Sequence, residues 1–265
     1  MFKIKKMVYL VLVLALLAFV FVGCSPAEDE ADGSLDRIVE AGEIIFVGSG
    51  GYPPFNFYDE DQVMGFDVDT GAAIAERLGV EMVYETSDWD GLPDGLRAGR
   101  YDAILGSMGI TEEREKIVSF TTPYYYSGAQ LIVREDSGFT GPDDMDGKDI
   151  GVITGETYVD DALGIGANDI HYSEVNQVLL EVIGGRIDGM ITDRVVAVNG
   201  MNEINRGDEL MLAGELMRTE VIAIAVRQED NELREAINAA LEEMHADGTM
   251  TAISMEWFGE DITKQ

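Results

Sequence analysis

The sequence predicts an α/β protein in which helices alternate with parallel strands. Short β-branched and aromatic runs such as EIIFVGS (43–49) alternate with runs of helical periodicity such as TGAAIAERLG (70–79). The run GRYDAIL at 99–105 returns as GRIDGMI at 185–191, each time after a helical stretch. Two similar α/β units, each with a helix that turns back into a parallel strand, account for this repeat.

The first unit is delimited by its turn signals. Strand 43–49 is followed by the loop GGYPPF, and a helix is expected to stop at Gly79. The expected elements are a strand at 43–49, a hairpin in 55–69 with its turn at 59–62, a helix at 70–79, a strand at 80–86, a helix in 88–99, a strand at 101–107 and a helix at 111–120.

The second unit repeats this alternation from Gly128 onward. Its last helix places Ile237, Leu241 and Met244 at helical spacing, which predicts a core-facing stripe. The expected elements are strands at 129–135 and 149–154, a helix in 155–164, a helix in 171–185, strands at 187–193 and 219–230, and a helix at 231–248.

The repeated run separates structural from functional positions. Gly99 and Gly185 are suited to end a helix in the left-handed conformation, and Asp102 and Asp188 at the strand starts are expected to be structural. Ligands of parallel sheets bind outside the carboxyl ends of the strands. The two sequences diverge there, so the two exits are expected to border one cleft.

The N-terminus predicts export. Lys3, Lys5 and Lys6 precede an unbroken apolar run at 7–22, which is shorter than the ~20 residues of a spanning helix. We interpret residues 1–23 as a signal peptide; the alternative is an uncleaved anchor. The segment FVGC resembles the bacterial lipoprotein cleavage box, which makes Cys24 the lipidation site. Because Cys24 is the sole cysteine, disulfides and cysteine-based metal sites are excluded.

The charge of the chain excludes several partners. Removal of residues 1–23 takes away three of 18 basic residues and leaves 15 against 51 acidic ones, a formal charge of −36. Such a surface repels nucleic acid and anionic lipid. Screening over ~8 Å leaves the choice of ligand to residues of the cleft itself. Residues 24–34 contain no large apolar side chain and are expected to form an acidic tether.

The order of motifs resembles the bacterial extracellular solute-binding proteins, in particular the branch that binds polar amino acids for ABC transporters. The segments that carry the resemblance are GGYPPFNF, GFDVDTGAAIAERLG, DWDGLPDGLRAGRYDAILGSMGITEER, FTTPYY, GKDIGVITGETY and GRIDGMITDRVVA. Thr70 departs from the apolar residue of the family signature. The resemblance implies a type II periplasmic-binding-protein fold, a two-lobe "Venus flytrap", with lobe 1 in 35–126 and 220–265, lobe 2 in 130–213, and hinge crossings at 126–130 and 213–221.

The resemblance also implies how the two ends of an α-amino acid would be held. Arg114 matches the carboxylate-binding arginine, and a guanidinium near a helix N-terminus is suited to that anion. Its alternative is a surface ion pair with Glu112 or Glu115. Asp193 matches the acid that takes the α-ammonium, and its alternative is an N-cap or turn aspartate.

Other family positions would complete the site. Tyr52 and Trp89 match the aromatic residues that enclose the ligand side chain, although burial in a lobe core is the competing interpretation. Ser107, Met108 and Gly109 match the segment that contacts the carboxylate, where Gly109 lacks the hydroxyl often found in the family.

Two positions of the second lobe bear on selectivity. Thr157 matches a carboxylate contact. Glu156 replaces a hydroxyl residue and could select a basic side chain; a solvent-facing glutamate is the alternative, and Asp90 has the same ambiguity.

Other chemistries find little support. No phosphate loop, nucleophile elbow or Ca²⁺ loop is present, and the two histidines, His171 and His245, lie far apart in sequence. We expect no cofactor, no metal and no catalytic residue.

The resemblance therefore predicts a monomeric, lipid-anchored receptor on the periplasmic or extracellular face of the cell membrane. It would capture a polar, potentially basic, amino acid by lobe closure and deliver it to the permease of an ABC importer. One alternative is an enzyme similar to cyclohexadienyl dehydratases, which needs a further acid in the cleft. Another is a ligand-sensing receptor with the same site.

Overall fold

The computed structural model describes residues 32–264. The predicted signal peptide, the lipidation site Cys24 and most of the tether lie outside this range, so their roles stay predictions. Within the described range no helix is both long enough and apolar enough to span a bilayer.

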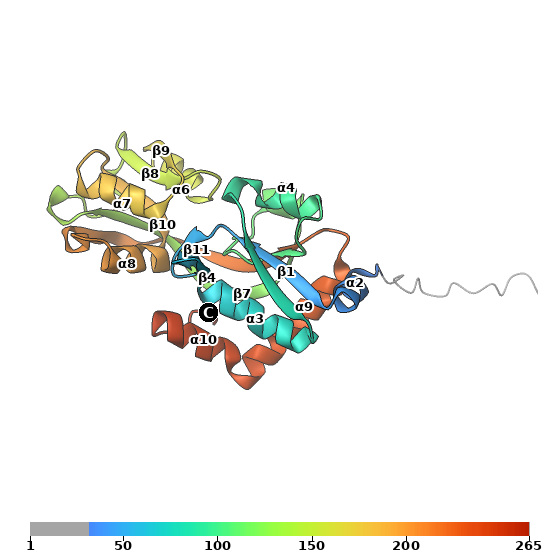
Figure 1. Ribbon diagram of the computed structural model, residues 1–265. Helices are drawn as coiled ribbons and strands as arrows, with labels where there is room; N and C mark the ends of the chain where they lie inside the picture. Colours follow the sequence, from blue (N-terminus) through green and yellow to red (C-terminus); the bar gives the residue numbers. More distant parts are fainter. Residues whose placement is uncertain (1–31, 265) are drawn as a thin grey trace, which may run out of the picture. The chain divides into compact units, whose positions relative to one another are not determined.

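Strands of residues 32–264 form one eight-stranded sheet, and three short strands form a second sheet (Figure 1). The order of the large sheet is β5-β1-β6-β11-β7-β10-β8-β9, with β5, β1 and β6 parallel at one side and β10, β8 and β9 parallel at the other. We call these two parallel groups, with the helices packed on them, the first and the second lobe. Their strands are β1 (Glu43–Gly48), β5 (Glu81–Thr86), β6 (Ala103–Ile104), β8 (Asp149–Ile153), β9 (Asn168–Tyr172) and β10 (Gly189–Asp193).

Two long antiparallel strands connect the lobes. β7 (Ser119–Arg134) pairs with β11 (Leu210–Val226) along most of their length, and their register is interrupted between Ala213 and Arg218. The expected hinge segments 126–130 and 213–221 lie within these two strands. The exact lobe and hinge boundaries stay predictions.

The small sheet is a hairpin with one additional strand. Its strands are β2 (Gly51–Tyr52), β3 (Asn56–Asp59) and β4 (Gln62–Met64). The turn expected at 59–62 is confirmed, because Asp59 pairs with Gln62.

Helices cover the sheets of both lobes (Figure 1). In the last long helix Ile237, Leu241 and Met244 are buried, as their spacing predicts. The helices are α2 (Ser34–Ala41), α3 (Phe66–Leu78), α4 (Leu92–Arg97), α5 (Glu112–Glu115), α6 (Tyr158–Gly164), α7 (Val175–Ile183), α8 (Arg194–Glu203), α9 (Asn231–Asp247) and α10 (Thr249–Phe258). Single 3-10 turns are η1 (Trp89–Gly91), η2 (Glu135–Ser137), η3 (Pro142–Asp144) and η4 (Gly207–Glu209).

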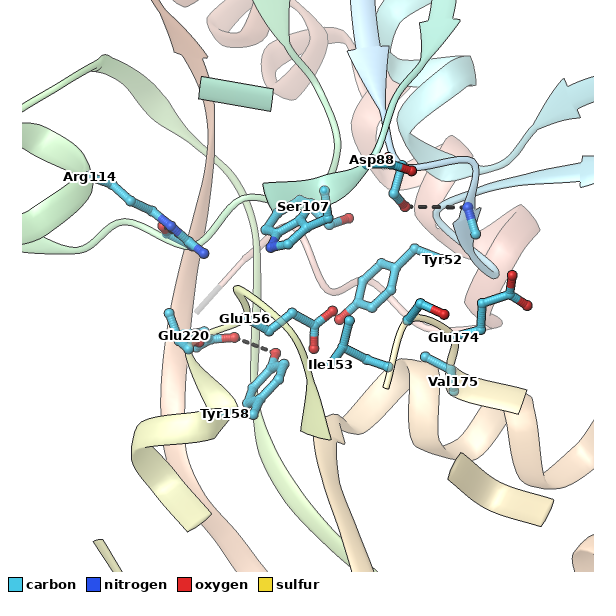
Figure 2. A pocket seen from close by; sticks show the side chains of 16 residues that line it. Tyr52, Asp88, Ser107, Arg114, Ile153, Glu156, Tyr158, Glu174, Val175 and Glu220 are labelled. Atoms are coloured by element: carbon cyan, nitrogen blue, oxygen red, sulfur yellow. Dashed lines mark hydrogen bonds between the residues drawn. The ribbon is translucent and has the colours of Figure 1, made fainter. Parts of the chain in front are cut away.

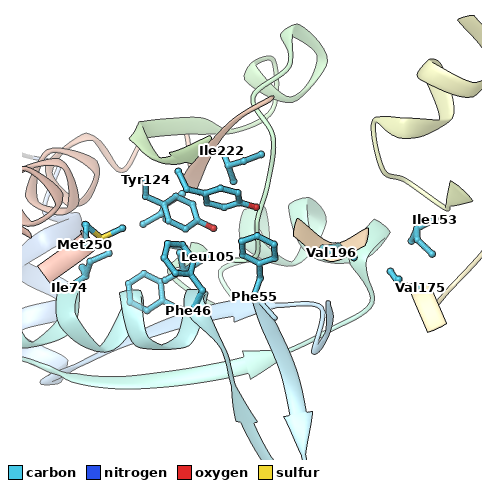
Figure 3. Packing of buried hydrophobic residues seen from close by; sticks show 14 of the residues in the cluster. Phe46, Phe55, Ile74, Leu105, Tyr124, Ile153, Val175, Val196, Ile222 and Met250 are labelled. Atoms are coloured by element: carbon cyan, nitrogen blue, oxygen red, sulfur yellow. The ribbon is translucent and has the colours of Figure 1, made fainter. Parts of the chain in front are cut away.

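Aromatic rings form the centre of the first-lobe core (Figure 3). Phe55 stacks on Tyr125 with ring centroids 4.8 Å apart, and Phe66 stacks on Tyr124 at 5.9 Å. All four side chains are buried. Such pairs contribute beyond the burial of their area, and they fix the backbone of the segments that carry them.

Four expected helices begin or end elsewhere. α3 starts at Phe66, ahead of the expected residue 70, because the N–H groups of Phe66 and Asp67 bond the carbonyl oxygens of Pro54 and Phe55 and turn the chain there. The expected helix 111–120 is limited to the single turn α5, since β7 claims the residues from Ser119. The helices expected in 155–164 and 171–185 start at Tyr158 and Val175; in the latter case residues 171–172 belong to β9.

The repeated run folds alike in both lobes. Gly99 and Gly185 have φ values of 70° and 65°, the left-handed conformation expected after a helix. Asp102 bonds Ile45 through both its backbone N–H (2.8 Å) and its carboxylate (2.9 Å), and Asp188 bonds Asp149 in the same two ways (2.8 and 3.0 Å). Both aspartates fasten the start of one parallel strand to its neighbour.

Candidate functional site

A cavity of about 280 Å³ is lined by residues of both lobes. From the first lobe and its loops come Tyr52, Trp89, Ser107, Gly109 and Arg114, and from the second Glu156 and Thr157. Figure 2 shows Tyr52 pointing across the cavity toward Glu156. Seven of the nine predicted ligand contacts therefore border one space; Met108 and Asp193 do not.

Arg114 lies in the single turn α5, which Thr111 caps by accepting the Arg114 N–H at 3.1 Å. Its guanidinium donates to the Gly109 carbonyl oxygen at 2.8 Å and, across to the second lobe, to the Gly155 carbonyl oxygen at 3.2 Å. It also lies 5.5 Å from the centroid of the Trp89 ring. Three of its five N–H donors are left, so the fork can still take a carboxylate.

Gly109 faces Arg114 across a tight space. A Cβ at this position would lie 3.2 Å from Oε1 of Glu220 and 3.6 Å from Nη1 of Arg114. The flanking bonds, Ile110 N–H to Val221 and Ala223 N–H to Met108, leave the Gly109 N–H out of the ladder to β11. The missing hydroxyl thus makes room for Glu220, and one main-chain donor stays available.

Met108 is a correction to the predicted site. It is 1% exposed and packs in a core cluster with Val47 and Leu92, so it does not line the cavity. Its side chain therefore points into the first-lobe core, whereas Ser107 and Gly109 on either side of it border the cavity.

The two donors of Ser107 are already engaged by protein groups, so the polar atoms that Ser107 can present to a ligand are acceptors, and its expected contact with the carboxylate stays a prediction. Its hydroxyl donates to the Asp67 carboxylate at 3.0 Å, and its N–H donates to the Tyr124 hydroxyl at 3.1 Å. Asp67 also accepts from Tyr124 (2.7 Å) and Asn56 (2.7 Å). Burial raises the pKa of Asp67 to about 6, although these three donors oppose the shift.

Asp193 ends β10 and caps α8. Its Oδ1 accepts from the N–H groups of Val195 at 2.7 Å and Val196 at 3.3 Å, which is the N-cap arrangement named above as the alternative. Its Oδ2 is buried and makes no well-formed hydrogen bond within residues 32–264, although the nearby Ser127 hydroxyl interacts with the carboxyl and opposes the rise of its pKa. Burial raises the pKa of Asp193 to about 7, and the nearby Glu220 adds to that shift. One carboxylate oxygen is thus left to hold an ammonium group, a role that stays a prediction.

Glu156 lies in the cavity wall. Its Oε2 is buried and has no partner within the described part of the chain. Burial raises its pKa to about 8, with Glu220 and Asp193 adding to the shift and Arg114 opposing it. Asp90 is exposed and outside the cavity lining, so of the two acids considered for selectivity only Glu156 reaches the cavity.

Two aromatic rings face the same space. Tyr52 stacks on Phe55 at 5.7 Å between centroids, and burial together with Glu156 and Asp193 raises the pKa of its hydroxyl. Trp89 lies beside the second-lobe loop, 3.2 Å from the place that a Cβ on Gly155 would occupy. Their apolar faces suit the aliphatic part of a ligand and also a cation.

Glu220, which was not among the predicted site residues, is the centre of a network of hydrogen bonds and ion pairs. Its Oε1 accepts from Thr157 at 2.6 Å and pairs with Arg218 at 2.8 Å, and its Oε2 accepts from Tyr158 at 2.5 Å (Figure 2). Arg218 also pairs with Asp161 at 2.8 Å. Because the Thr157 hydroxyl is engaged by Glu220, its N–H is the donor that Thr157 has left for a ligand. The sequence feature that could have indicated this network is the run RTE at 218–220, which places Arg218 and Glu220 on the same face of a strand.

Within residues 32–264 no group of three histidine, cysteine or acidic side chains is arranged to hold a metal. His171 pairs with Asp169 at 2.7 Å on the surface.

The geometry is that of a two-lobe receptor, and comparison with known proteins identifies the family. The model of the bacterial extracellular solute-binding proteins, family 3, matches residues 44–260. The chain is a member of that family. The predicted type II fold and the predicted recognition of a polar amino acid-binding protein are confirmed at the level of the family.

Relatives of this solute-binding protein bind amino acids. The L-cystine-binding protein of Escherichia coli is 33% identical over 240 residues, which cover 88% of this chain and 89% of the relative. The L-arginine-binding protein of Pseudomonas aeruginosa is 32% identical, over 80% of this chain and 86% of the relative. The crystal structure of an ancestral arginine-binding protein bound to arginine superposes with a TM-score of 0.77 at 35% identity, over 82% of this chain and 99% of that one.

Proposed function

We propose that this solute-binding protein captures an α-amino acid with a cationic side chain and delivers it to an ABC importer. The ligand carboxylate would lie at Arg114 and the N–H groups of Gly109 and Thr157, and the α-ammonium at Oδ2 of Asp193 and the acceptors of Ser107. The side chain would extend between Tyr52 and Trp89 toward Glu156.

The observation that carries the cationic side chain is the excess of buried acids around the cavity. Arg218 pairs with both Asp161 and Glu220, so this network holds one cation and two carboxylates and has no cation to spare for Glu156. Arg114 can offset a ligand carboxylate, and Asp193 can offset the α-ammonium. Glu156 then remains with an unpartnered buried oxygen, and a buried carboxylate needs a cation or a proton.

The pKa values of the cavity acids point to the same ligand. Burial raises the pKa of Glu156 to about 8 and the pKa of Asp193 to about 7. A cation that binds beside such a carboxyl favours its ionised form, so each raised pKa would fall on binding of a cationic ligand. The arginine-binding relatives support this assignment, whereas the cystine-binding relative supports a ligand with a second ammonium group.

Lobe closure would couple capture to transport. The Arg114–Gly155 hydrogen bond joins the lobes directly, at the place where a bound carboxylate would also touch both of them. A ligand that completes contacts to both lobes favours the closed state by its differential affinity for that state.

The cellular setting is part of the proposal. We propose that residues 1–23 direct export, that Cys24 carries a lipid anchor, and that the mature monomer meets the permease at the outer face of the membrane. Loss of amino acid uptake on deletion of the gene tests the transport role against a sensor role.

A thermal-shift screen with the twenty amino acids, cystine and citrulline tests the ligand class. A ligand at a hundred times its dissociation constant adds ~2.7 kcal/mol to the free energy of unfolding. We expect arginine to raise the melting temperature and its uncharged isostere citrulline to raise it far less. An equal response to both would contradict the role of Glu156.

A dehydratase is the second candidate, because such an enzyme needs a further acid in the cleft and burial raises the pKa of Glu156 to about 8. Against it, the acids Asp193 and Glu220 beside the cavity disfavour an anionic substrate such as prephenate. We expect no release of phenylpyruvate from prephenate, and measurable release would replace the receptor by an enzyme.

A further inference from the structure

Ser107 has an unusual backbone conformation in the cavity wall. Its φ is 60°, the left-handed region, which residues with a Cβ avoid. Such strained residues cluster at binding sites and persist only where the surroundings hold them. Ser107 is 9% exposed and borders the cavity, so its conformation decides which of its atoms the ligand meets.

A closed set of hydrogen bonds holds Ser107 in place. Its hydroxyl donates to Oδ2 of Asp67, its N–H donates to the Tyr124 hydroxyl, and that hydroxyl donates to Oδ1 of Asp67. Asp67 and Tyr124 have no exposed surface. Both donors of Ser107 are thereby directed into the lobe, and the polar atoms it has left are acceptors, which suit an ammonium group.

The same carboxylate reaches a second wall of the cavity. Asn56 donates to Asp67 at 2.7 Å, and Oδ1 of Asn56 accepts the Gly50 N–H at 2.9 Å in the loop that leads to Tyr52. Asp67 itself lies behind this wall and does not line the cavity.

We propose that Asp67 is a positioning residue, which acts through Tyr124 to hold Ser107 in the conformation that presents its acceptors to the α-ammonium of the ligand. This inference rests on the proposed amino acid site. It gives the first aspartate of GFDVD a role in affinity, in addition to its place in the core.

The test is a double-mutant cycle. In it, Ser107→Gly removes the need for the hydrogen bonds to Asp67 and Tyr124 that hold residue 107 in the left-handed conformation. Glycine adopts a φ of 60° without strain. In the Ser107→Gly background, the loss of Asp67 or Tyr124 should therefore have little effect on the conformation of residue 107. Asp67→Asn and, independently, Tyr124→Phe are measured in the wild-type and the Ser107→Gly background by calorimetric titration with arginine. We expect each to raise the Kd about tenfold in the first background and less than about threefold in the second.

Tyr101→Phe is the matched control. Tyr101 is a buried tyrosine of the same lobe whose hydroxyl donates to the Leu92 carbonyl oxygen, away from the cavity. We expect it to lower the melting temperature and to leave the Kd unchanged.

Two results would overturn the inference. One is an equal rise of the Kd in both backgrounds; the other is a lowered melting temperature with an unchanged Kd in the wild-type background. If Asp67→Asn does not fold, Tyr124→Phe decides between these results alone. A wild-type protein that binds no amino acid would instead refute the proposed function, which the titration of the unmutated protein reveals directly.

Discussion

The runs 99–105 and 185–191 enter their strands alike and leave them differently. At the entrance, a left-handed glycine ends the helix and an aspartate ties the strand to its parallel neighbour, with bond lengths that agree within 0.1 Å between the lobes. The residues at the entrances stabilise the pairing of parallel strands, and this requirement is the same in both lobes.

The exits share no such device. In the first lobe the chain passes through Ser107, whose donors are withdrawn into the core, to Gly109 and Arg114. In the second lobe the strand ends at Asp193, which caps α8 with one oxygen and, within residues 32–264, makes no well-formed hydrogen bond with the other, beside the Ser127 hydroxyl. The carboxylate and the ammonium group of one zwitterion need partners of opposite charge. The residues that follow the two strands must therefore differ, even though the strands begin alike.

The largest effect is expected from breaking the exit of the first lobe. Arg114→Ala removes the partner of the ligand carboxylate and leaves that charge uncompensated, at a cost of ~3–5 kcal/mol. We expect affinity to fall by hundreds- to thousands-fold in a calorimetric titration. Arg97→Ala, at an exposed arginine of α4, is the control and should leave affinity unchanged. A loss of only a few-fold for Arg114→Ala would refute its role.

The exit of the second lobe is tested next. Asp193→Asn keeps a good helix cap but removes the charge that would meet the ammonium. We expect a loss of affinity of about tenfold to a hundredfold with little change in melting temperature. Asp188→Asn, at the entrance of the same strand, should do the reverse. If both variants lower only the melting temperature, Asp193 is a cap and nothing more.

A smaller effect is expected from pH. Glu156 and Asp193 keep their protons up to about pH 8 and about pH 7 without ligand, and a bound cation favours their ionised forms. Binding then releases protons, so affinity for arginine should rise by at least about tenfold between pH 6 and pH 8. Glu156→Gln should flatten this rise. Titrations at several pH values check it, and an affinity that falls with pH would contradict the assignment.

The stability of the ligand-free protein should change with pH in the direction opposite to the affinity for arginine. A carboxyl whose pKa is raised on folding contributes stability below its unfolded pKa and loses it as pH rises through the folded value. For Glu156 this window runs from 4.5 to about 8. We expect the melting temperature of the ligand-free protein to fall across this window, and less so in Glu156→Gln.

The smallest effect on affinity is expected at the entrances. Asp102→Ala and Asp188→Ala each remove a carboxylate that accepts a strand N–H, which costs ~1–3 kcal/mol of the free energy of unfolding. Asp102→Ala should cost more, because Asp102 also pairs with Arg37 at 2.6 Å. Denaturant titration measures both, and the Kd should stay unchanged. A weakened Kd would show that the entrances serve the ligand as well.

Sequence reasoning predicted what local pattern decides. Turn glycines, the hairpin, the alternation of helices with parallel strands and the apolar stripe of α9 follow from periodicity and from residues with special backbone freedom. Resemblance to the family placed Arg114, Tyr52 and Glu156 in the site and supplied their expected roles.

The rest depends on partners that are distant in the sequence. Met108 was misplaced because only the packing of Val47 and Leu92 shows which way it points. Glu220 and Asp67 were missed because their importance comes from Thr157 and Ser107, 63 and 40 residues away. The shortness of α5 is likewise decided by the pairing of β7 with β11.

The most direct test is a crystal structure of the protein with arginine bound. We expect the ligand carboxylate within about 3 Å of the Arg114 guanidinium and the α-ammonium within about 3 Å of Oδ2 of Asp193, with one lobe supplying each contact. An arginine whose α-ammonium is held elsewhere while Oδ2 of Asp193 faces only protein, or whose carboxylate lies away from Arg114, would contradict this expectation.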